Sequence, residues 1–252
     1  MHPPAVLLDD NDDVYDYYLR HQQNRWKALA AYAVLARRFR PRVLFAENAK
    51  QQLKALIRSG RPVIYAINHL STSDPYTVAA TAWRSPLRTK IGRVRVLAKD
   101  ELFVDPEQRR KVDMMGGIPV FRGKDHGIRA VNAAGQRMMD VCAQRLAGGD
   151  HLAIFPEGTC NEVDHTKVQA VGSGIGHIAF RAAKLDAAPA LVAIGMNYGA
   201  YDAGRQPTAA EVVAGIAYFK APILELPQRP ADIARLVRQE LQLAVDGAVA
   251  HY

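Results

Sequence analysis

Short apolar runs alternate with amphipathic stretches along most of the chain. The runs have lengths typical of buried strands and are Arg61–Asn68, Arg93–Lys99, Gly117–Arg122, His151–Phe155, Pro189–Asn197 and Gly215–Ile223. Helix-like stretches fill three of the intervals, Pro75–Trp83, Gly127–Leu146 and Gly174–Lys184. Strands that alternate with helices predict an α/β fold with a mostly parallel or mixed central sheet and helices on both faces.

Both ends of the chain also show helical spacing. Tyr15, Leu19, Trp26, Leu29 and Ala33 recur at intervals that predict one helix over residues 14–39. A second helix is predicted from Glu47 to Arg58, ending at Gly60, and a last one from about residue 230 to Val245. We therefore expect a helical N-terminal extension over residues 1–41 and an α/β domain over residues 42–252.

Composition narrows the classes of protein and partner. Of 252 residues, 49% are hydrophobic, which is enough for a sizeable core. The two cysteines form no CxxC pair, so neither a disulfide framework nor a thiolate metal site is expected. We expect no signal peptide and no membrane-spanning segment. The net charge of +8 gathers in Arg20–Arg42 and Arg84–Lys124, which favours anionic partners such as phospholipid headgroups, a phosphorylated cofactor or nucleic acid.

The first candidate site is the turn after the strand that contains VIYAI. Ligands collect outside the carboxyl ends of strands in such sheets, and His69 comes just past this end. Pro75 suits the start of a helix, which leaves Asp74 on a turn that can fold back to His69. A carboxylate on Nδ1 of His69 would leave Nε2 free as a base for a substrate hydroxyl. The alternatives are that Asp74 caps its own helix and that His69 is a satisfied loop histidine.

A second strand, His151–Phe155, ends in a turn that carries Glu157, Gly158 and Thr159. Together with Asn68–Asp74 and Gly117–Arg122, this turn resembles the glycerolipid acyltransferases, in particular the 1-acylglycerol-3-phosphate (lysophosphatidate) acyltransferases. That family carries an N-H-x4-D block, a block that ends in arginine and an F-P-E-G-T block in this order. Its fourth, apolar block resembles residues 188–194. The resemblance extends over about residues 62–197.

The resemblance implies transfer of a fatty acyl group from an acyl-CoA or acyl-carrier-protein thioester to a hydroxyl of a lysophosphatidate-like lipid, in phospholipid biosynthesis. His69 would be the general base and Asp74 its orienting partner. Arg122, Glu157, Gly158 and Thr159 would form the acceptor site. No metal and no bound cofactor are implied.

One departure from the family concerns the acceptor. Family members commonly continue F-P-E-G-T with an arginine, but Cys160 stands at that position here. A neutral thiol cannot bind a phosphate as an arginine does. An acceptor without a phosphate, such as a glycolipid, an aminolipid or a specialised metabolite, is therefore an open alternative.

The basic residues also bear on where the protein acts in the cell, and two other functions remain as alternatives. The helix that carries Trp26, with its basic residues, is typical of an interfacial helix, which predicts a cytoplasmic protein attached peripherally to the inner face of the membrane. The other interpretation is a helix packed on the core with its charged face in water. A basic nucleic-acid-binding protein remains an alternative, although no recognition motif supports it. So does a metal hydrolase that uses His69, Asp74 and Glu157.

Overall fold

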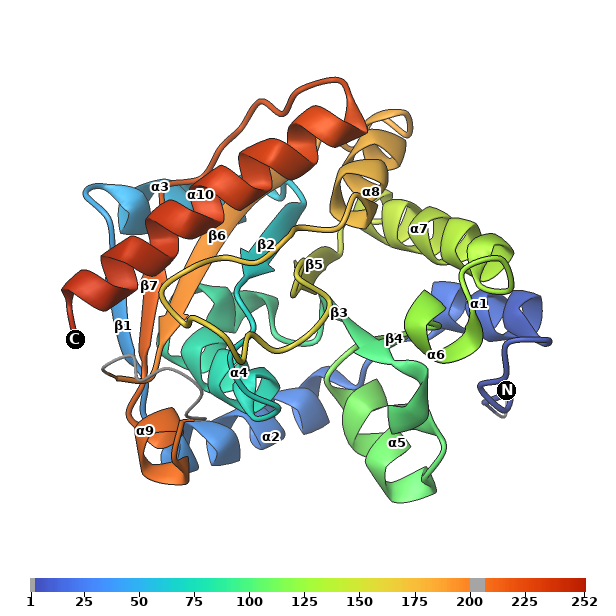
Figure 1. The fold of residues 1–252 in the computed structure, drawn as a ribbon, viewed down its shortest axis with the longest axis horizontal. Coiled ribbons are helices and arrows are strands. Elements are labelled where there is room, and N and C mark those ends of the chain that lie inside the picture. Colours follow the sequence, from blue (N-terminus) through green and yellow to red (C-terminus); the bar gives the residue numbers. More distant parts are fainter. Residues whose placement is uncertain (1–2, 200–206) are drawn as a thin grey trace.

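The computed structural model describes residues 3–199 and 207–252, which fold around a seven-stranded sheet (Figure 1). The strand order is β1, β7, β6, β2, β5, β3, β4. Every neighbouring pair is parallel except β6 with β7, which confirms the predicted mostly parallel sheet. The strands are β1 Arg42–Phe45, β2 Val63–Ile67, β3 Val94–Lys99, β4 Gly117–Val120, β5 His151–Ile154, β6 Ala190–Asn197 and β7 Ile216–Phe219.

Helices connect the strands and cover the sheet. The α-helices are α1 Asn11–Arg20, α2 Arg25–Arg38, α3 Ala49–Ser59, α4 Asp74–Arg84, α5 Pro106–Met114, α6 Gly123–His126, α7 Asn132–Ala147, α8 Gly174–Ala183, α9 Ala209–Val213 and α10 Pro230–Ala250. Two short 3-10 helices, η1 Pro86–Lys90 and η2 Asp100–Phe103, precede and follow β3 along the chain. No helix of the described residues is long and apolar enough to cross a bilayer.

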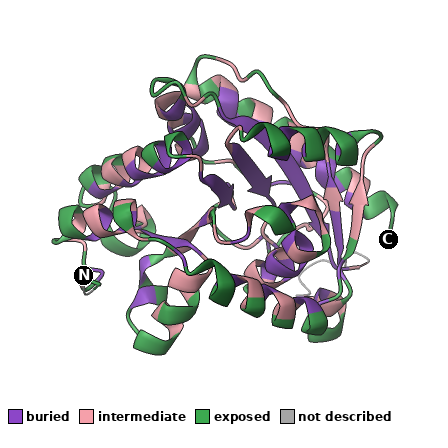
Figure 2. Ribbon diagram, turned by 180° about the vertical axis from the view of Figure 1, so that it is seen from behind, coloured by how far each residue is buried: buried purple, intermediate pink, exposed green. Residues whose placement is uncertain are grey.

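The alternation of side chains along β2 divides the core into two layers. Val63, Tyr65 and Ile67 face one apolar cluster, to which α2, α3 and α4 contribute. Ile64 and Ala66 face the other, to which α1, α7, α8 and α10 contribute. All five residues of β2 are buried, as Figure 2 shows for the centre of the sheet, because helices cover both faces.

The predicted helix over residues 14–39 is wrong as a single element. It is two helices, α1 and α2, and they belong to different layers of the core. The Asn24 side chain accepts a hydrogen bond from the Lys27 amide at 3.0 Å, which starts α2. The Gln23 amide donates to the carbonyl of Met114 at 3.0 Å. The segment between the helices therefore carries the chain from one face of the sheet to the other.

Other boundaries differ less. The predicted helix Gly127–Leu146 begins later, at Asn132, because Gly127 adopts a φ of 89° after the separate helix α6. The strand β1 and the helices α5 and α9 were not predicted at all. The boundary predicted at residue 41 stays a prediction, although α1 packs on α7 and α2 on α4.

The topology brings four loops to one edge of the sheet. Strands β2, β5, β3 and β4 are neighbours in this order and run parallel, so their carboxyl ends lie side by side. The loops after these ends begin with Asn68, Phe155, Asp100 and Phe121. This is the edge at which an α/β sheet binds its ligands.

Candidate active site

The turn after β2 folds back on itself so that His69 meets Asp74. The Nδ1 atom of His69 lies 2.8 Å from Oδ2 of Asp74. The same oxygen accepts the backbone N–H groups of Leu70 at 2.6 Å and of Ser71 at 3.0 Å. Asp74 is the first residue of α4, but its carboxylate binds groups that precede the helix and not the N–H groups of α4. The predicted pairing is present, and the capping alternative is wrong.

A tyrosine completes the surroundings of this carboxylate. The hydroxyl of Tyr198, just after β6, donates to Oδ1 of Asp74 at 2.6 Å. Asp74 is 0% exposed, so its four donors replace the water that a carboxylate would otherwise bind. The carboxylate is thereby fixed in place, and with it the Nδ1 side of the His69 ring.

The imidazole of His69 is flanked by two side chains from the loop after β5. The ring of Phe155 stacks on it with 4.4 Å between centroids and 25° between planes. The sulfur of Cys160 lies 3.5 Å from Nε2 and 3.8 Å from Nδ1. A sulfur in the ring plane beside Nε2 would be much farther from Nδ1, so the thiol lies over the ring. His69 also lines an apolar cavity, from which a substrate can reach the ring.

Glu157 joins the two loops. Its Oε1 accepts the backbone N–H of His69 at 2.9 Å, and its Oε2 accepts that of Gln169 at 2.9 Å. The carbonyl of His69 in turn accepts the N–H of Asn161 at 2.6 Å. Both carboxylate oxygens are therefore engaged with the backbone, and the residue holds the His69 turn against the loop after β5. Burial raises the pKa of Glu157.

The remaining predicted residues lie farther from His69. Arg122 follows β4 and forms an ion pair with Asp125 at 2.5 Å, while its buried Nη1 has no partner among the described residues. Because β4 is the third strand from β2, the backbones of these two strands lie about 14 Å apart across the sheet. Gly158, with a φ of 70°, and Thr159 are exposed in the turn after β5.

Two residues of the site were not predicted to act in it. Tyr198 contacts Asp74 from 124 positions away in sequence. Asn68 exchanges two hydrogen bonds with the backbone of Met196, at 2.6 and 3.0 Å, which fixes the start of the turn against β6. For Tyr198 the sequence signal was its position just after a strand, whereas Asn68 also belongs to the N-H-x4-D block.

An apolar cavity of about 240 Å³ opens beside His69. Its walls come from β3, α4 and α5 and from Phe155, and they are mostly apolar. Two cations also line it, Lys99 at the end of β3 and Lys111 on α5. The site thus combines a histidine, an apolar cavity and positive charge. Among the described residues, no group of three His, Cys, Asp or Glu side chains is placed to hold a metal ion.

The charge state of His69 predicts how activity depends on pH. Burial alone would lower its pKa, but the hydrogen bond to Asp74 and the contact with Cys160 raise the pKa to about 9. The basic form then increases with pH, so kcat/KM should rise by about tenfold per pH unit and level off near pH 9. Cys160→Ala should move this inflection to lower pH, because the thiol contributes to the raised pKa.

The measurement is initial rates against pH, corrected for the uncatalysed reaction. An inflection that Cys160→Ala leaves unchanged would contradict the role of Cys160 in raising the pKa of His69.

The raised pKa of His69 should also make the stability of the fold depend on pH. Because folding raises the pKa from 6.5, protonated His69 stabilises the fold below about pH 6.5, and this contribution is lost as the pH rises towards 9.

Comparison with known proteins bears on this site directly. The model of the family described as Acyltransferase matches residues 41–197, which is more than half of the chain. The matched segment contains the His69 turn, Arg122, Glu157 and Cys160. No curated protein sequence matches the chain.

Proposed function

The chain belongs to the Acyltransferase family, the family of glycerolipid acyltransferases such as the 1-acylglycerol-3-phosphate acyltransferases, and from this premise we propose its reaction. It transfers a fatty acyl group from an acyl-CoA or acyl-carrier-protein thioester to a hydroxyl of a lipid. The observation that carries the proposal is the contact of 2.8 Å between His69 and a buried Asp74, beside an apolar cavity. Family membership favours this over the nucleic-acid alternative.

In the proposed mechanism, Nε2 of His69 takes the proton of the acceptor hydroxyl. The oxygen attacks the carbonyl carbon of the thioester, and the tetrahedral intermediate collapses with loss of the thiolate. The thiolate then takes the proton from the imidazolium, so that a thiol and an ester leave the site. Asp74 stabilises the positive charge that His69 carries between these steps.

The cavity beside His69 suits the acyl chain of the donor. Its wall includes Val96, Leu102, Val112 and Met115, and contact with such side chains favours burial of methylene groups. Lys99 and Lys111 line the same cavity and can attract the phosphates of the donor or of the acceptor.

The more specific part of the proposal is the chemical class of the acceptor lipid. Cys160 occupies the position of the family's arginine and touches the His69 ring, while Arg122 follows β4, the third strand from β2. No arginine of the described residues lines the cavity beside His69. This observation favours an acceptor without a phosphate next to that hydroxyl, such as a glycolipid or an aminolipid, over lysophosphatidate.

A panel of acyl thioesters and acceptors tests both the acyl transfer and the class of acceptor, with thiol release and product mass as readouts. We expect transfer to a lipid hydroxyl, with kcat/KM for a neutral monoacylglycerol at least equal to that for a matched lysophosphatidate. Cys160→Arg should improve the phosphate-bearing acceptor about tenfold relative to the neutral one, because an arginine binds phosphate in bidentate fashion. A wild-type preference for lysophosphatidate above a hundredfold would overturn the neutral acceptor. Absence of any ester product would overturn acyl transfer.

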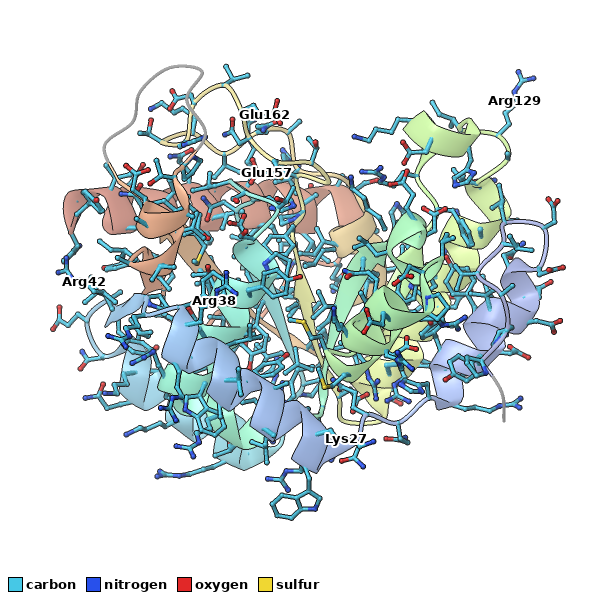
Figure 3. All side chains as sticks on the ribbon, turned by 90° about the horizontal axis from the view of Figure 1, so that it is seen from below. Lys27, Arg38, Arg42, Arg129, Glu157 and Glu162 are labelled. Atoms are coloured by element: carbon cyan, nitrogen blue, oxygen red, sulfur yellow. The ribbon has the colours of Figure 1, made fainter. Side chains whose placement is uncertain are left out.

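We also propose peripheral contact with the inner face of the membrane through α2. Ala28, Tyr32 and Ala36 bury one face of this helix, so the packing of α2 on the core is confirmed. Its other face exposes Trp26 at 79% and Val34 at 66%, among exposed Arg25, Lys27, Arg37 and Arg38. Figure 3 shows Lys27 on the opposite side of the molecule from Glu157.

Vesicle sedimentation tests this contact. The protein should bind vesicles that contain anionic lipid more tightly than neutral ones, and Trp26→Ala should weaken that binding several-fold. The matched control is Trp83→Ala, since Trp83 lies on α4 under the guanidinium of Arg88. Equal binding to neutral and anionic vesicles would contradict the role of α2.

A further inference from the structure

A basic hollow lies in the protein surface between the end of α3 and the helix η1. It has a volume of about 440 Å³, and the residues that line it are Lys54, Ile57, Arg58, Pro86, Thr89 and Lys90. Three of these six side chains are cationic and none is acidic. A hollow with charges of one sign attracts a ligand of the opposite sign, so its composition favours an anion.

The cations of the basic hollow are not neutralised by the part of the protein that the structure describes. No carboxylate of the described residues forms an ion pair with Lys54, Arg58 or Lys90. Lys54 and Arg58 stand one helical turn apart on α3, a spacing at which like charges destabilise a helix. Burial lowers the pKa of His151 to about 4, and the charge of Lys90 adds to this effect. A bound anion would supply a partner to all three cations.

The basic hollow lies at the opposite edge of the sheet from His69. The helix α3 leads into the amino end of β2 and η1 into that of β3, whereas His69 follows the carboxyl end of β2. At about 3.3 Å per residue, the length of β2 separates the two edges by about 16 Å. The hollow also shares no lining residue with the cavity beside His69. A ligand bound there would therefore not compete with the substrates.

The same edge of the sheet carries the start of α2, the helix proposed to contact the membrane. Arg25 begins α2 and packs against Gly92, where an added Cβ would lie 3.1 Å from the Cα of Arg25. Gly92 stands between Lys90 of the basic hollow and the start of β3. Trp26, the next residue of α2, is therefore on the same side of the molecule as the hollow. A lipid surface that Trp26 enters would bring its headgroups to the hollow.

We propose that the basic hollow binds the phosphate monoester of a lipid headgroup, as in phosphatidate, and so directs the protein to membranes that contain such a lipid. A phosphate monoester carries a charge of about −1.5 to −2 at pH 7 and three strong acceptor oxygens, which suits a group of cations. A phosphodiester headgroup has less charge and fewer free oxygens, so it should bind less tightly. This inference rests on the proposed contact of α2 with the membrane and not on acyl transfer.

Vesicle sedimentation with two anionic lipids tests the hollow. Vesicles that contain phosphatidate or phosphatidylglycerol are matched in zeta potential, so that they differ in phosphate chemistry and not in surface charge. We expect the wild type to bind the phosphatidate vesicles about fivefold more tightly, and Lys54→Ala combined with Arg58→Ala should bring this ratio close to one. The double variant should unfold at no lower temperature than the wild type, because it removes repulsion between like charges.

The matched control is Lys124→Ala combined with Arg129→Ala, which removes the same charge from two exposed positions. Figure 3 shows Arg129 on the side of Glu157, away from Lys27. This control should keep the ratio between the two kinds of vesicle. Trp26→Ala should weaken binding to both kinds and also keep the ratio, which separates the basic hollow from the contact of α2.

The outcomes distinguish this inference from the rest of the proposal. Equal binding of the wild type to the two kinds of vesicle would overturn the hollow and leave the contact of α2 and acyl transfer intact. Binding to neither kind would overturn the hollow together with the contact of α2. A preference for phosphatidate that the double variant keeps would contradict the assignment to Lys54 and Arg58.

A soluble probe distinguishes a lipid headgroup from a free phosphate. Glycerol 3-phosphate carries the same monoester in solution, without the acyl chains that hold it in a membrane. If it raised the thermal midpoint of the wild type while phosphatidate vesicles gave no preference, the ligand would be a soluble phosphate. The assignment to a lipid headgroup would then be wrong.

Discussion

His69→Ala should reduce acyl transfer by about 10²- to 10⁴-fold, because it removes the only group placed to take the proton of the acceptor hydroxyl among the described residues of the site. The loss should appear in kcat, measured as thiol release at saturating donor and acceptor. The fold should survive, because the Asp74 carboxylate keeps the backbone donors Leu70 and Ser71 and the Tyr198 hydroxyl.

The matched control for this change is His251→Ala. His251 lies at the end of α10, where its ring contacts the carbonyl of Gly247. This variant should keep wild-type turnover. A His69→Ala protein that is folded and turns over within tenfold of wild type would remove the general base from the mechanism.

Asp74→Asn should also lower kcat by about 10²- to 10⁴-fold, although the imidazole itself is untouched. The N–H groups of Leu70 and Ser71 hold the asparagine carbonyl oxygen at the Oδ2 position, so Nδ1 keeps an acceptor, but the variant lacks the negative charge that stabilises the imidazolium formed when His69 takes the proton. The variant also loses a carboxylate with four donors, so the free energy of unfolding should fall by about 1–3 kcal/mol. Kinetics at saturating substrate and chemical denaturation measure the two effects separately.

Tyr198→Phe distinguishes orientation from general loosening of the site. It removes one donor to Oδ1 of Asp74 and leaves the contact between Oδ2 and His69 in place. We expect less than about a tenfold loss of kcat, with a loss of stability of about 1 kcal/mol. If Tyr198→Phe and Asp74→Asn reduced turnover equally, the carboxylate would act through packing of the turn and not through its charge beside His69.

Much of the site could be predicted because it is local in sequence. His69 and Asp74 are five positions apart, and Pro75 fixes where α4 starts, so the turn geometry follows from a few residues. The alternation of apolar runs also specified the sheet, since parallel strands buried on both faces need continuous apolar sequences. Family resemblance then supplied the order of the separate blocks.

What could not be predicted depends on distant contacts. Tyr198 meets Asp74 only because β6 lies next to β2, and the local pattern of apolar residues does not determine the order of the strands. The break between α1 and α2 was missed because apolar residues continue at helical spacing across it, while Gln23 and Asn24 bind backbone groups that the pattern does not show. Likewise, the engagement of both Glu157 oxygens by backbone amides requires the fold of two loops.

Because the Cys160 thiol lies over the His69 ring, its accessibility should report whether a substrate is bound at the site. Cys160 is partly accessible, whereas Cys142 is buried and its pKa is raised to about 12, so the latter has almost no reactive thiolate. An alkylating dye added to the native protein would therefore label one position, within contact distance of the imidazole. Its rate of attachment would follow how long donors and acceptors shield that sulfur, and it would measure binding in the absence of any chemical turnover.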